Sequence, residues 1–366
     1  MNTEARFSEA DPAQNPAQNL AHTHNLSTIK PVRVALYRNL SVIPEWLEKT
    51  KAYCRDPAPE AVRAADWFLD NEYQIARAVR GLRNDLSIEF YNRLPALWVD
   101  GRRSVPRIFD LAHSLIDMAE PQLTLAVIIQ FVSDYQKISP LTNAELWALP
   151  SMLRLACLEH LVDSFQHIDD ALAAPFDISA QTKRGRARRP VDRIARSITN
   201  LIAVQAIKWP DFVDQTSLIE ARLSEDPAGV YPRMNFDTRD RYRKCIEQLA
   251  DRSTLDEIQI ARETLTLAQS RSDCARKSHV GFWLIDAGRA ELEQEIKYKR
   301  SISESLIRIA RQHTVTLYFC ALICGLLLSF IVPVIYLSRN EAGPWLWIAG
   351  LLISLIPASL LSVYTV

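Results

Sequence analysis

The chain has 366 residues, enough for one large domain or two ordinary ones. Its 43 Lys and Arg residues balance its 43 Asp and Glu residues, so no field over the whole molecule attracts nucleic acid, and we expect no nucleic acid partner. Glycine supplies only 9 residues, and none forms the Gly-rich loops that hold phosphates in Rossmann and P-loop proteins, so both classes are excluded.

The first part of the chain combines an irregular segment with a strong helix signal. The first 30 residues are rich in Ala, Gln, Asn and Pro and lack periodicity, so we expect a disordered tail over 1–30. Asp56 and Pro57 then form an N-cap followed by a proline of the first turn. Apolar residues recur every three or four positions up to Leu86, as on the buried face of an amphipathic helix.

Further helix starts are marked by a proline, or by Ser or Thr followed three residues later by an acidic residue. These starts lie at Pro106, Pro121, Thr142, Ser253 and Ser301. The segment after Pro121 is apolar nearly all round but too short to cross a membrane, which is typical of a core helix. No segment shows sustained period-two alternation between turns, so we predict an all-α fold without a sheet.

Residues that bind metals or perform catalysis do not form a recognisable pattern. The six cysteines are dispersed and lack C-x-x-C spacing, which indicates neither a zinc site nor a disulfide scaffold. His160 and His167 share a helix face, but a metal site would need a closer pair or a third ligand, so we interpret both as surface or hydrogen-bonded histidines. We therefore predict no catalytic residue, no metal ligand and no cofactor in this chain.

A basic linker over 181–196 separates the two halves of the helical region. One interpretation is contact with anionic lipid headgroups, worth ~1 kcal/mol per basic residue near a membrane. Nucleic acid is a second possibility, and a solvated loop that leads into a helix is the third. The candidate residues for lipid contact are Lys183, Arg184, Arg186, Arg188, Arg189, Arg193 and Arg196.

The stretch over 226–250 is the most distinctive in the sequence, because a Pro- and Gly-containing turn leads into a highly charged helix start. Asp237 is predicted to cap this helix. The charged residues that follow could grip a phosphate or stack on a sugar, or they could fix helix packing. This candidate polar cluster comprises Asp237, Arg239, Asp240, Arg241, Tyr242 and Arg243.

Two stretches near the end are long and apolar enough to cross a membrane. Residues 314–337 and 345–366 carry no charge and are joined by seven residues, which predicts a transmembrane helical hairpin. The sequence ends together with the second span, so we expect a longer natural polypeptide. Basic residues gather before the first span, which places residues 1–313 in the cytoplasm. These residues are Lys297, Lys299, Arg300, Arg308 and Arg311.

Several runs resemble the N-terminal region of the cyclic β-1,2-glucan synthases, large inner-membrane proteins of Gram-negative bacteria. The order and spacing of the runs agree with that family, and the two spans follow in the same place. The run that contains DPAGVY and TRDRYR is the most specific. The resembling runs are residues 64–97, 106–117, 138–161, 207–250 and 279–293.

The resemblance implies a glucosyltransferase that polymerises β-1,2-glucan from UDP-glucose at the cytoplasmic face, with a phosphorylase-like C-terminal domain that governs chain length. Its transferase module is expected to use Asp-x-Asp and Gln-x-x-Arg-Trp motifs. Neither motif occurs in this sequence, so no catalytic residue of the family is carried over to any position here.

Together these observations predict a multi-helix cytoplasmic domain followed by a two-helix transmembrane hairpin in the bacterial inner membrane. We expect a scaffold or regulatory role within a glucan synthase, with the lipid bilayer and the remaining synthase modules as partners. The alternative is a stand-alone inner-membrane adaptor that binds protein or anionic lipid. The predicted segments are the tail over 1–30, a helical subdomain over 31–180, the basic linker over 181–196, a second helical subdomain over 197–300, and a helix entering the membrane with the hairpin over 301–366.

Overall fold

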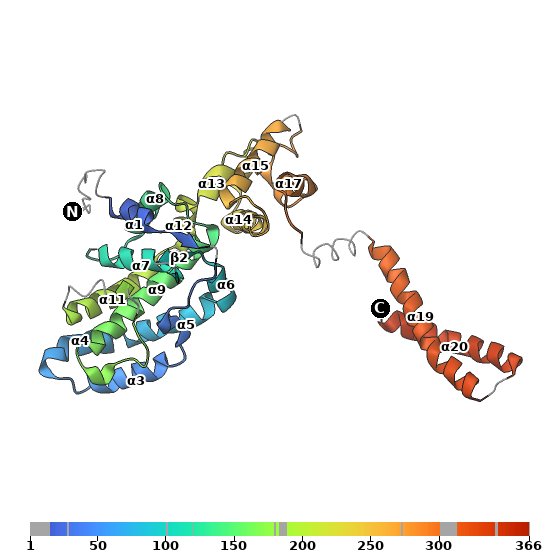
Figure 1. Ribbon diagram of the computed structural model, residues 1–366, viewed down its shortest axis with the longest axis horizontal. Helices are drawn as coiled ribbons and strands as arrows, with labels where there is room; N and C mark the ends of the chain where they lie inside the picture. Colours follow the sequence, from blue (N-terminus) through green and yellow to red (C-terminus); the bar gives the residue numbers. More distant parts are fainter. Residues whose placement is uncertain are drawn as a thin grey trace. The chain divides into compact units, whose positions relative to one another are not determined.

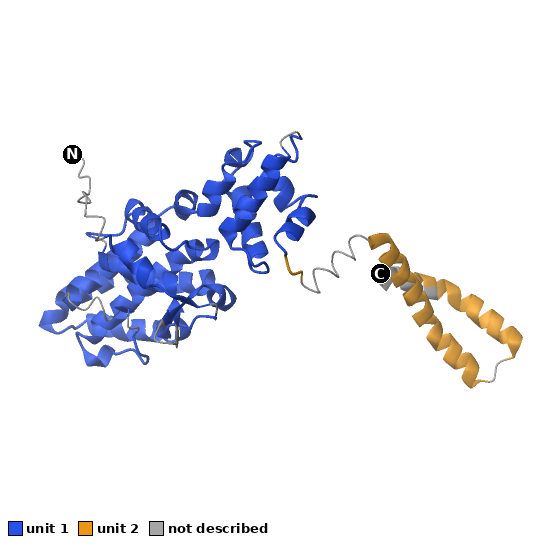
Figure 2. Cartoon of the chain, turned by 45° about the horizontal axis from the view of Figure 1, so that its top comes forward, with its two compact units in different colours: residues 1–297 blue, residues 298–366 orange. Residues whose placement is uncertain are grey.

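The computed structural model describes residues 15–27, 29–99, 102–118, 120–178, 181–182, 189–271, 274–300, 313–340 and 343–365. The chain divides into two compact units, Met1–Lys297 and Tyr298–Val366 (Figure 2). Helices account for most of the described residues in both units, so the all-α prediction is confirmed (Figure 1).

The first unit is a set of helices with one small sheet. Its helices are α1 Pro16–Thr23, α2 Ala35–Arg38, α3 Ile43–Cys54, α4 Val62–Asp70, α5 Glu72–Asp85, α6 Ile88–Arg93, α7 Arg107–Met118, α8 Leu125–Gln136, α9 Asn143–Gln166, α11 Pro190–Ala206, α12 Trp209–Thr216, α13 Leu218–Leu223, α14 Phe236–Ala250, α15 Glu257–Ser270, α16 Val280–Leu284 and α17 Arg289–Glu295. Its strands are β1 Leu26–Ser27, β2 Ala96–Val99 and β3 Arg102–Pro106.

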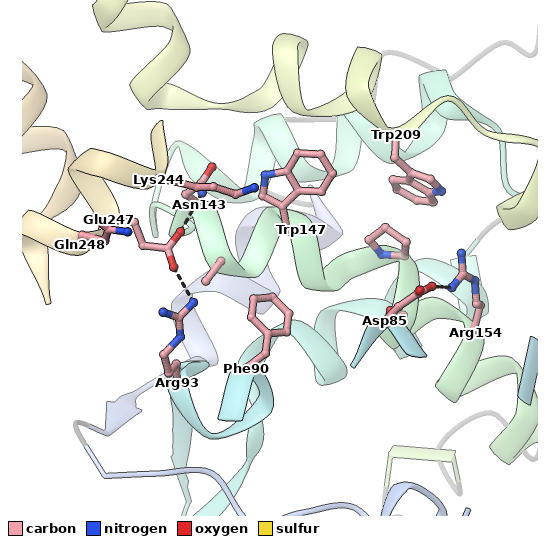
Figure 3. A pocket seen from close by; sticks show the side chains of 13 residues that line it. Asp85, Phe90, Arg93, Asn143, Trp147, Arg154, Trp209, Lys244, Glu247 and Gln248 are labelled. Carbon is pink, nitrogen blue, oxygen red and sulfur yellow. Dashed lines mark hydrogen bonds and ion pairs between the residues drawn. The ribbon is translucent and has the colours of Figure 1, made fainter. Parts of the chain in front are cut away.

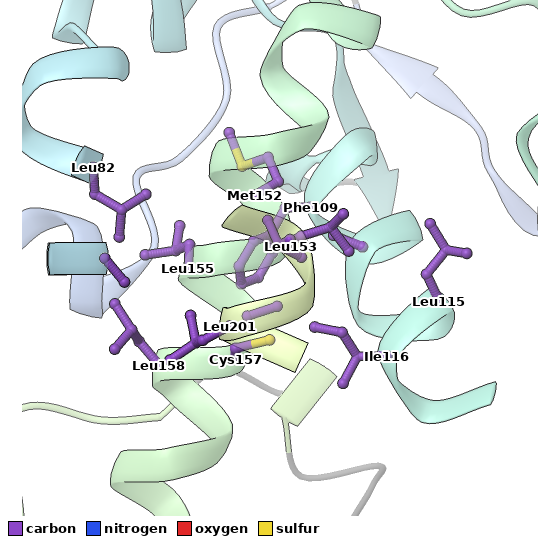
Figure 4. Close-up of a cluster of buried hydrophobic side chains, with 14 of the residues drawn as sticks. Leu82, Phe109, Leu115, Ile116, Met152, Leu153, Leu155, Cys157, Leu158 and Leu201 are labelled. Carbon is purple, nitrogen blue, oxygen red and sulfur yellow. The ribbon is translucent and has the colours of Figure 1, made fainter. Parts of the chain in front are cut away.

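Helix α9 forms the centre of the first unit. It is apolar on nearly every face, and a helix of this kind is stable only when others surround it. Helices α5, α7 and α11 pack along it, and Figure 4 shows Met152, Leu153 and Leu155 of α9 among side chains from these neighbours. The helix begins at the predicted capping box, in which Thr142 and Glu145 bond each other's backbone N–H groups.

The antiparallel sheet β1–β2–β3 contradicts the expectation of a fold without a sheet. Leu26 pairs with Leu97, and the ladder between β2 and β3 shifts register between Ala96 and Trp98. The strands have two, four and five residues, too few for a period-two pattern to stand out from the sequence around it.

Helix α1 and strand β1 lie in the segment that was expected to be a disordered tail. In the described part of 1–30, the Asn15 side chain caps α1, Pro16 occupies its first turn, and Ala17 and Ala21 are buried. His24 then contacts the Tyr135 hydroxyl at 2.7 Å. The fully buried residues of α1 are two alanines, with Leu20 partly buried beside them, so the composition of the segment does not reveal the helix.

The basic linker does not divide the first unit into two subdomains. Helix α11 begins at Pro190, inside the predicted linker, and packs along α9 and α4. Residues from both predicted subdomains therefore belong to one compact unit, which ends at Lys297, close to the expected boundary at residue 300.

The second unit consists of helices α19 Thr314–Arg339 and α20 Pro344–Thr365, which pack against each other. Within the described residues, α19 is the one helix that is long and apolar enough to cross a membrane, with a mean hydropathy of 2.6. The predicted helical entry over 301–312 lies outside the described residues.

Candidate functional site

The structure splits the predicted polar cluster on α14 into a buried group and an exposed group. Asp240, Tyr242 and Arg243 are buried, whereas Asp237 and Arg241 are exposed. Four of the six residues thus lie at or near the packed face of the helix, because Arg239 is half-buried beside them.

Two arginines of the cluster bind carboxylates on neighbouring helices. Arg239 donates to Asp214 of α12 at 2.6 Å, and Arg243 donates to the same carboxylate at 3.2 Å. Both guanidinium groups also bond Glu220 of α13, which accepts a further hydrogen bond from Tyr231 at 2.7 Å. This arginine–carboxylate network holds α14 against α12 and α13. It engages both guanidinium groups, as expected if the charges fix helix packing.

The predicted N-cap at Asp237 is wrong. Helix α14 begins at Phe236, and the side chain of Asn235 accepts a hydrogen bond from the Thr238 N–H at 2.9 Å. Asn and Asp are equally good caps, so two such residues within three positions leave the start of a helix ambiguous in sequence. Asp237 instead lies exposed in the first turn, near the positive end of the helix dipole.

Replacing the true cap should destabilise the chain measurably. We expect Asn235→Ala to lower the free energy of unfolding by about 1 kcal/mol. Asn235→Ser should retain most of the stability of the parent chain, because the serine hydroxyl also accepts the bond from the backbone N–H. Asp237→Ala should cost less, about 0.5 kcal/mol, because it removes only an interaction with the dipole. Urea unfolding followed by tryptophan fluorescence measures these differences, and a larger loss for Asp237→Ala than for Asn235→Ala would contradict this assignment.

The basic linker contains arginines that face the protein interior. Arg193 has an exposed fraction of 6 % and donates to Asp163 at 2.7 Å. Arg196 donates to the backbone carbonyls of Ile116 and Asp117 at 2.6 and 3.0 Å. Both residues are therefore removed from the set predicted to contact lipid, because their guanidinium groups bind other parts of the fold. Arg189 is exposed, and Lys183, Arg184, Arg186 and Arg188 lie outside the described residues.

His160 belongs to a buried polar chain rather than to a metal site. Its Nδ1 accepts a hydrogen bond from Arg193 at 2.8 Å, and its Nε2 lies 3.1 Å from Nδ1 of His113. Burial and the neighbouring Arg193 charge lower the pKa of His160 to about 3, so the ring is neutral. The interpretation of His160 as a hydrogen-bonded histidine is confirmed.

A cleft of about 600 Å³ opens on the first unit beside α9. Sequence reasoning missed it. Its residues come from α5, α6, α9, α14 and the start of α12. They are Asp85, Phe90, Arg93, Asn143, Ala144, Trp147, Pro150, Ser151, Arg154, Trp209, Lys244, Glu247 and Gln248.

Three aromatic rings and two ion pairs line this cleft. On one side Arg93 bonds Glu247 at 2.7 Å, and on the other Arg154 bonds Asp85 at 2.6 Å. Figure 3 shows the rings of Phe90 and Trp147 between these pairs, and the ring of Trp209 above the Asp85–Arg154 pair. The ring of Trp147 also contacts the edge of Phe236, and that of Trp209 contacts the edge of Phe212.

Local features of two helices position the charged groups of the cleft. Asn143 is the first residue of α9, and its amide donates to Glu247 at 2.9 Å, which ties α14 to the start of α9. Arg154 lies against Gly81, where an added Cβ would be 3.3 Å from its Nη1. All residues that line the cleft fall within the resembling runs 64–97, 138–161 and 207–250, although their spacing in the sequence does not indicate a cleft.

Comparison with known proteins supports the predicted resemblance. No protein-family model matches the chain. The chain is similar to the cyclic beta-(1,2)-glucan synthase NdvB of Rhizobium meliloti (strain 1021), with 26 % identity over 322 residues, covering 68 % of this chain and 11 % of that protein. The chain thus spans about a tenth of the length of this curated relative. This similarity confirms the predicted resemblance to the N-terminal region of a cyclic β-1,2-glucan synthase.

Proposed function

We propose that this chain is a membrane-anchored helical module that serves a cyclic β-1,2-glucan synthase as a scaffold or regulatory element. The observation that carries the proposal is the similarity to a glucan synthase over 68 % of the chain. Transfer of glucose from UDP-glucose takes place on other modules, because the transferase motifs expected of the resembled family are missing from this sequence.

Helices α19 and α20 form the membrane anchor in this proposal, as a transmembrane hairpin in the bacterial inner membrane. Their large apolar side chains are exposed, with fractions of 70 % at Val315 and 81 % at Trp345, which is costly in water and favourable in lipid. The basic residues before α19 favour a cytoplasmic location of the first unit in this proposal. Its partners are the lipid bilayer and the catalytic modules of the synthase.

Deleting the first unit tests the proposal, whether this chain acts alone or within a longer polypeptide. We expect in-frame deletion of residues 15–297 from the chromosomal gene to abolish β-1,2-glucan synthesis from UDP-glucose in isolated membranes, or to change the size of the product. The purified chain alone should transfer no glucose. Residues 1–366 should resist alkaline extraction from membranes, whereas residues 1–297 should be released.

Three outcomes would contradict this function. Unchanged glucan after the deletion would remove the scaffold or regulatory role. Glucan made by the purified chain without any synthase would place the catalytic machinery here. Release of the full chain by alkaline extraction would contradict the membrane anchor.

A further inference from the structure

We propose that the cleft beside α9 binds a short β-1,2-linked gluco-oligosaccharide, an inference that rests on the proposed function in glucan synthesis. The ligand is a neutral polyhydroxyl chain that lies on the aromatic rings and is hydrogen-bonded at both ends by the ion pairs. The cleft volume of about 600 Å³ lies within the ~300–1,000 Å³ typical of small-molecule sites.

The aromatic rings supply apolar surface of the kind that a sugar needs. One face of a glucose ring presents C–H groups, and an aromatic ring offers a flat, apolar surface to pack against it. Phe90, Trp147 and Trp209 are each only partly buried, so each retains exposed surface. The indole N–H of Trp209 donates to the Val204 carbonyl at 3.1 Å, which fixes this ring before a ligand arrives.

The charged groups of the cleft suit a neutral ligand better than a phosphate. Arg93 is paired with Glu247, Arg154 with Asp85, and Lys244 with Asp240 at 2.7 Å. An anion would have to displace a carboxylate from each cation, or lie beside that carboxylate. These considerations favour glucan over the pyrophosphate of a nucleotide sugar.

The same ion pairs match the hydrogen-bonding groups of a sugar. Each hydroxyl both donates and accepts, while carboxylates accept and guanidinium groups donate in a fixed plane. Asn143 also lines the cleft: its amide nitrogen bonds Glu247, and its buried Oδ1 has no hydrogen-bond partner among the described residues. Neighbouring hydroxyls of a glucan can therefore be held without breaking either ion pair.

Isothermal titration calorimetry of the detergent-solubilised full chain tests the inference. The probes are β-1,2-linked gluco-oligosaccharides of two to five residues, with β-1,3-linked gluco-oligosaccharides and UDP-glucose as comparisons. We expect saturable binding of the β-1,2-linked series. Trp147→Ala and Trp209→Ala should each weaken it at least tenfold. The matched control is Trp98→Ala, since Trp98 is 40 % exposed on β2, outside the cleft, and its loss should leave binding unchanged.

A substitution at the rim keeps the test decisive if a tryptophan variant fails to fold. Gln248 is exposed, so Gln248→Trp should fold normally and should weaken binding at least tenfold by filling the mouth of the cleft. Absence of binding, tighter binding of UDP-glucose, or binding that Gln248→Trp leaves unchanged would overturn the proposal. So would occupancy of the cleft by a peptide in preference to glucan.

The outcome separates this inference from the proposed function. If no glucan binds but deletion of residues 15–297 still alters glucan synthesis, the cleft proposal fails and the proposed function stands. If the β-1,2-linked series binds in the cleft but the deletion leaves synthesis unchanged, the cleft proposal is supported and the proposed function fails.

Discussion

We expect Glu220→Gln to lower the free energy of unfolding of the chain by about 3–5 kcal/mol. Glu220 has an exposed fraction of 4 % and bonds Arg239, Arg243 and Tyr231. Its loss leaves the fully buried Arg243 with only Asp214, which lies at 3.2 Å, and Asp240, at 3.7 Å, as countercharges. Removing one partner of a buried ion pair is costly because the remaining charge stays desolvated.

A neighbouring ion pair provides the matched control. Glu225, just beyond α13, pairs at 3.0 Å with Arg222 in the last turn of that helix, and both side chains are about half exposed. We expect Glu225→Gln to change the free energy of unfolding by less than about 0.5 kcal/mol, as is usual for surface pairs. Urea unfolding of the detergent-solubilised chain measures both variants. Equal, small effects would show that the network does not hold α14, and the polar cluster would become a candidate ligand site again.

The residues around this network show how the most distinctive run of the sequence is packed. Asp226 accepts hydrogen bonds from the N–H groups of Val230, Tyr231 and Val280, and it contacts His279 at 2.9 Å. Gly229 takes a φ of 60° at the turn, a conformation that glycine adopts without strain. One carboxylate thus closes the turn and joins it to α16. The charged and polar side chains of this run therefore contribute to the packing of the helices.

The features predicted correctly from sequence are those that local patterns determine. The capping box of Thr142 and Glu145 lies within four residues. The apolar repeat before Leu86 is correct in part, because Val79, Leu82 and Leu86 are buried, whereas the stretch divides into α4 and α5 and Tyr73 is exposed. Both depend on neighbours along the chain. The same reasoning fails for Arg193, because a count of charges along the chain does not tell which side of α11 meets α9.

The cleft could not be predicted because it assembles residues that are far apart in sequence. Asp85 and Arg154 form one ion pair and Arg93 and Glu247 the other, across four helices and about 160 positions. The spacing of charged residues along the sequence does not indicate either ion pair. The tryptophans of the cleft carry no distinguishing signal in the sequence, because aromatic residues in helices are usually largely buried. Only the packing of α5, α6 and α14 around α9 brings these groups together.

The second large effect is a dependence of stability on pH that arises at Glu257. This residue lies in the first turn of α15 and accepts a hydrogen bond from the Asn143 N–H at 2.8 Å. Burial raises the pKa of its carboxyl to about 8. The hydrogen bond from Asn143 lowers this pKa, and the negative charges of Glu247, Glu145 and Asp251 raise it. The folded state therefore binds the proton more tightly than the unfolded chain does.

The direction of the effect follows from that difference. The protonated carboxyl contributes its full stabilisation below pH about 4.5, the ordinary value, and loses it as the pH rises through about 8. We expect Glu257→Gln, which cannot ionise and can accept the same N–H bond, to match the parent chain at pH 5. At pH 8.5 the variant should be the more stable by on the order of 3 kcal/mol.

Urea unfolding at pH 5, 6.5 and 8.5 checks this expectation, with Glu225→Gln as an exposed control that should differ by less than about 0.5 kcal/mol at each pH. A constant difference between Glu257→Gln and the parent chain would contradict the proton uptake. The Asn143 N–H bonded by Glu257 belongs to the first residue of α9, whose side chain lines the cleft and bonds Glu247. Ionisation of Glu257 places a second negative charge near Glu247. The rise in pH that destabilises the fold therefore also adds negative charge near the wall of the cleft.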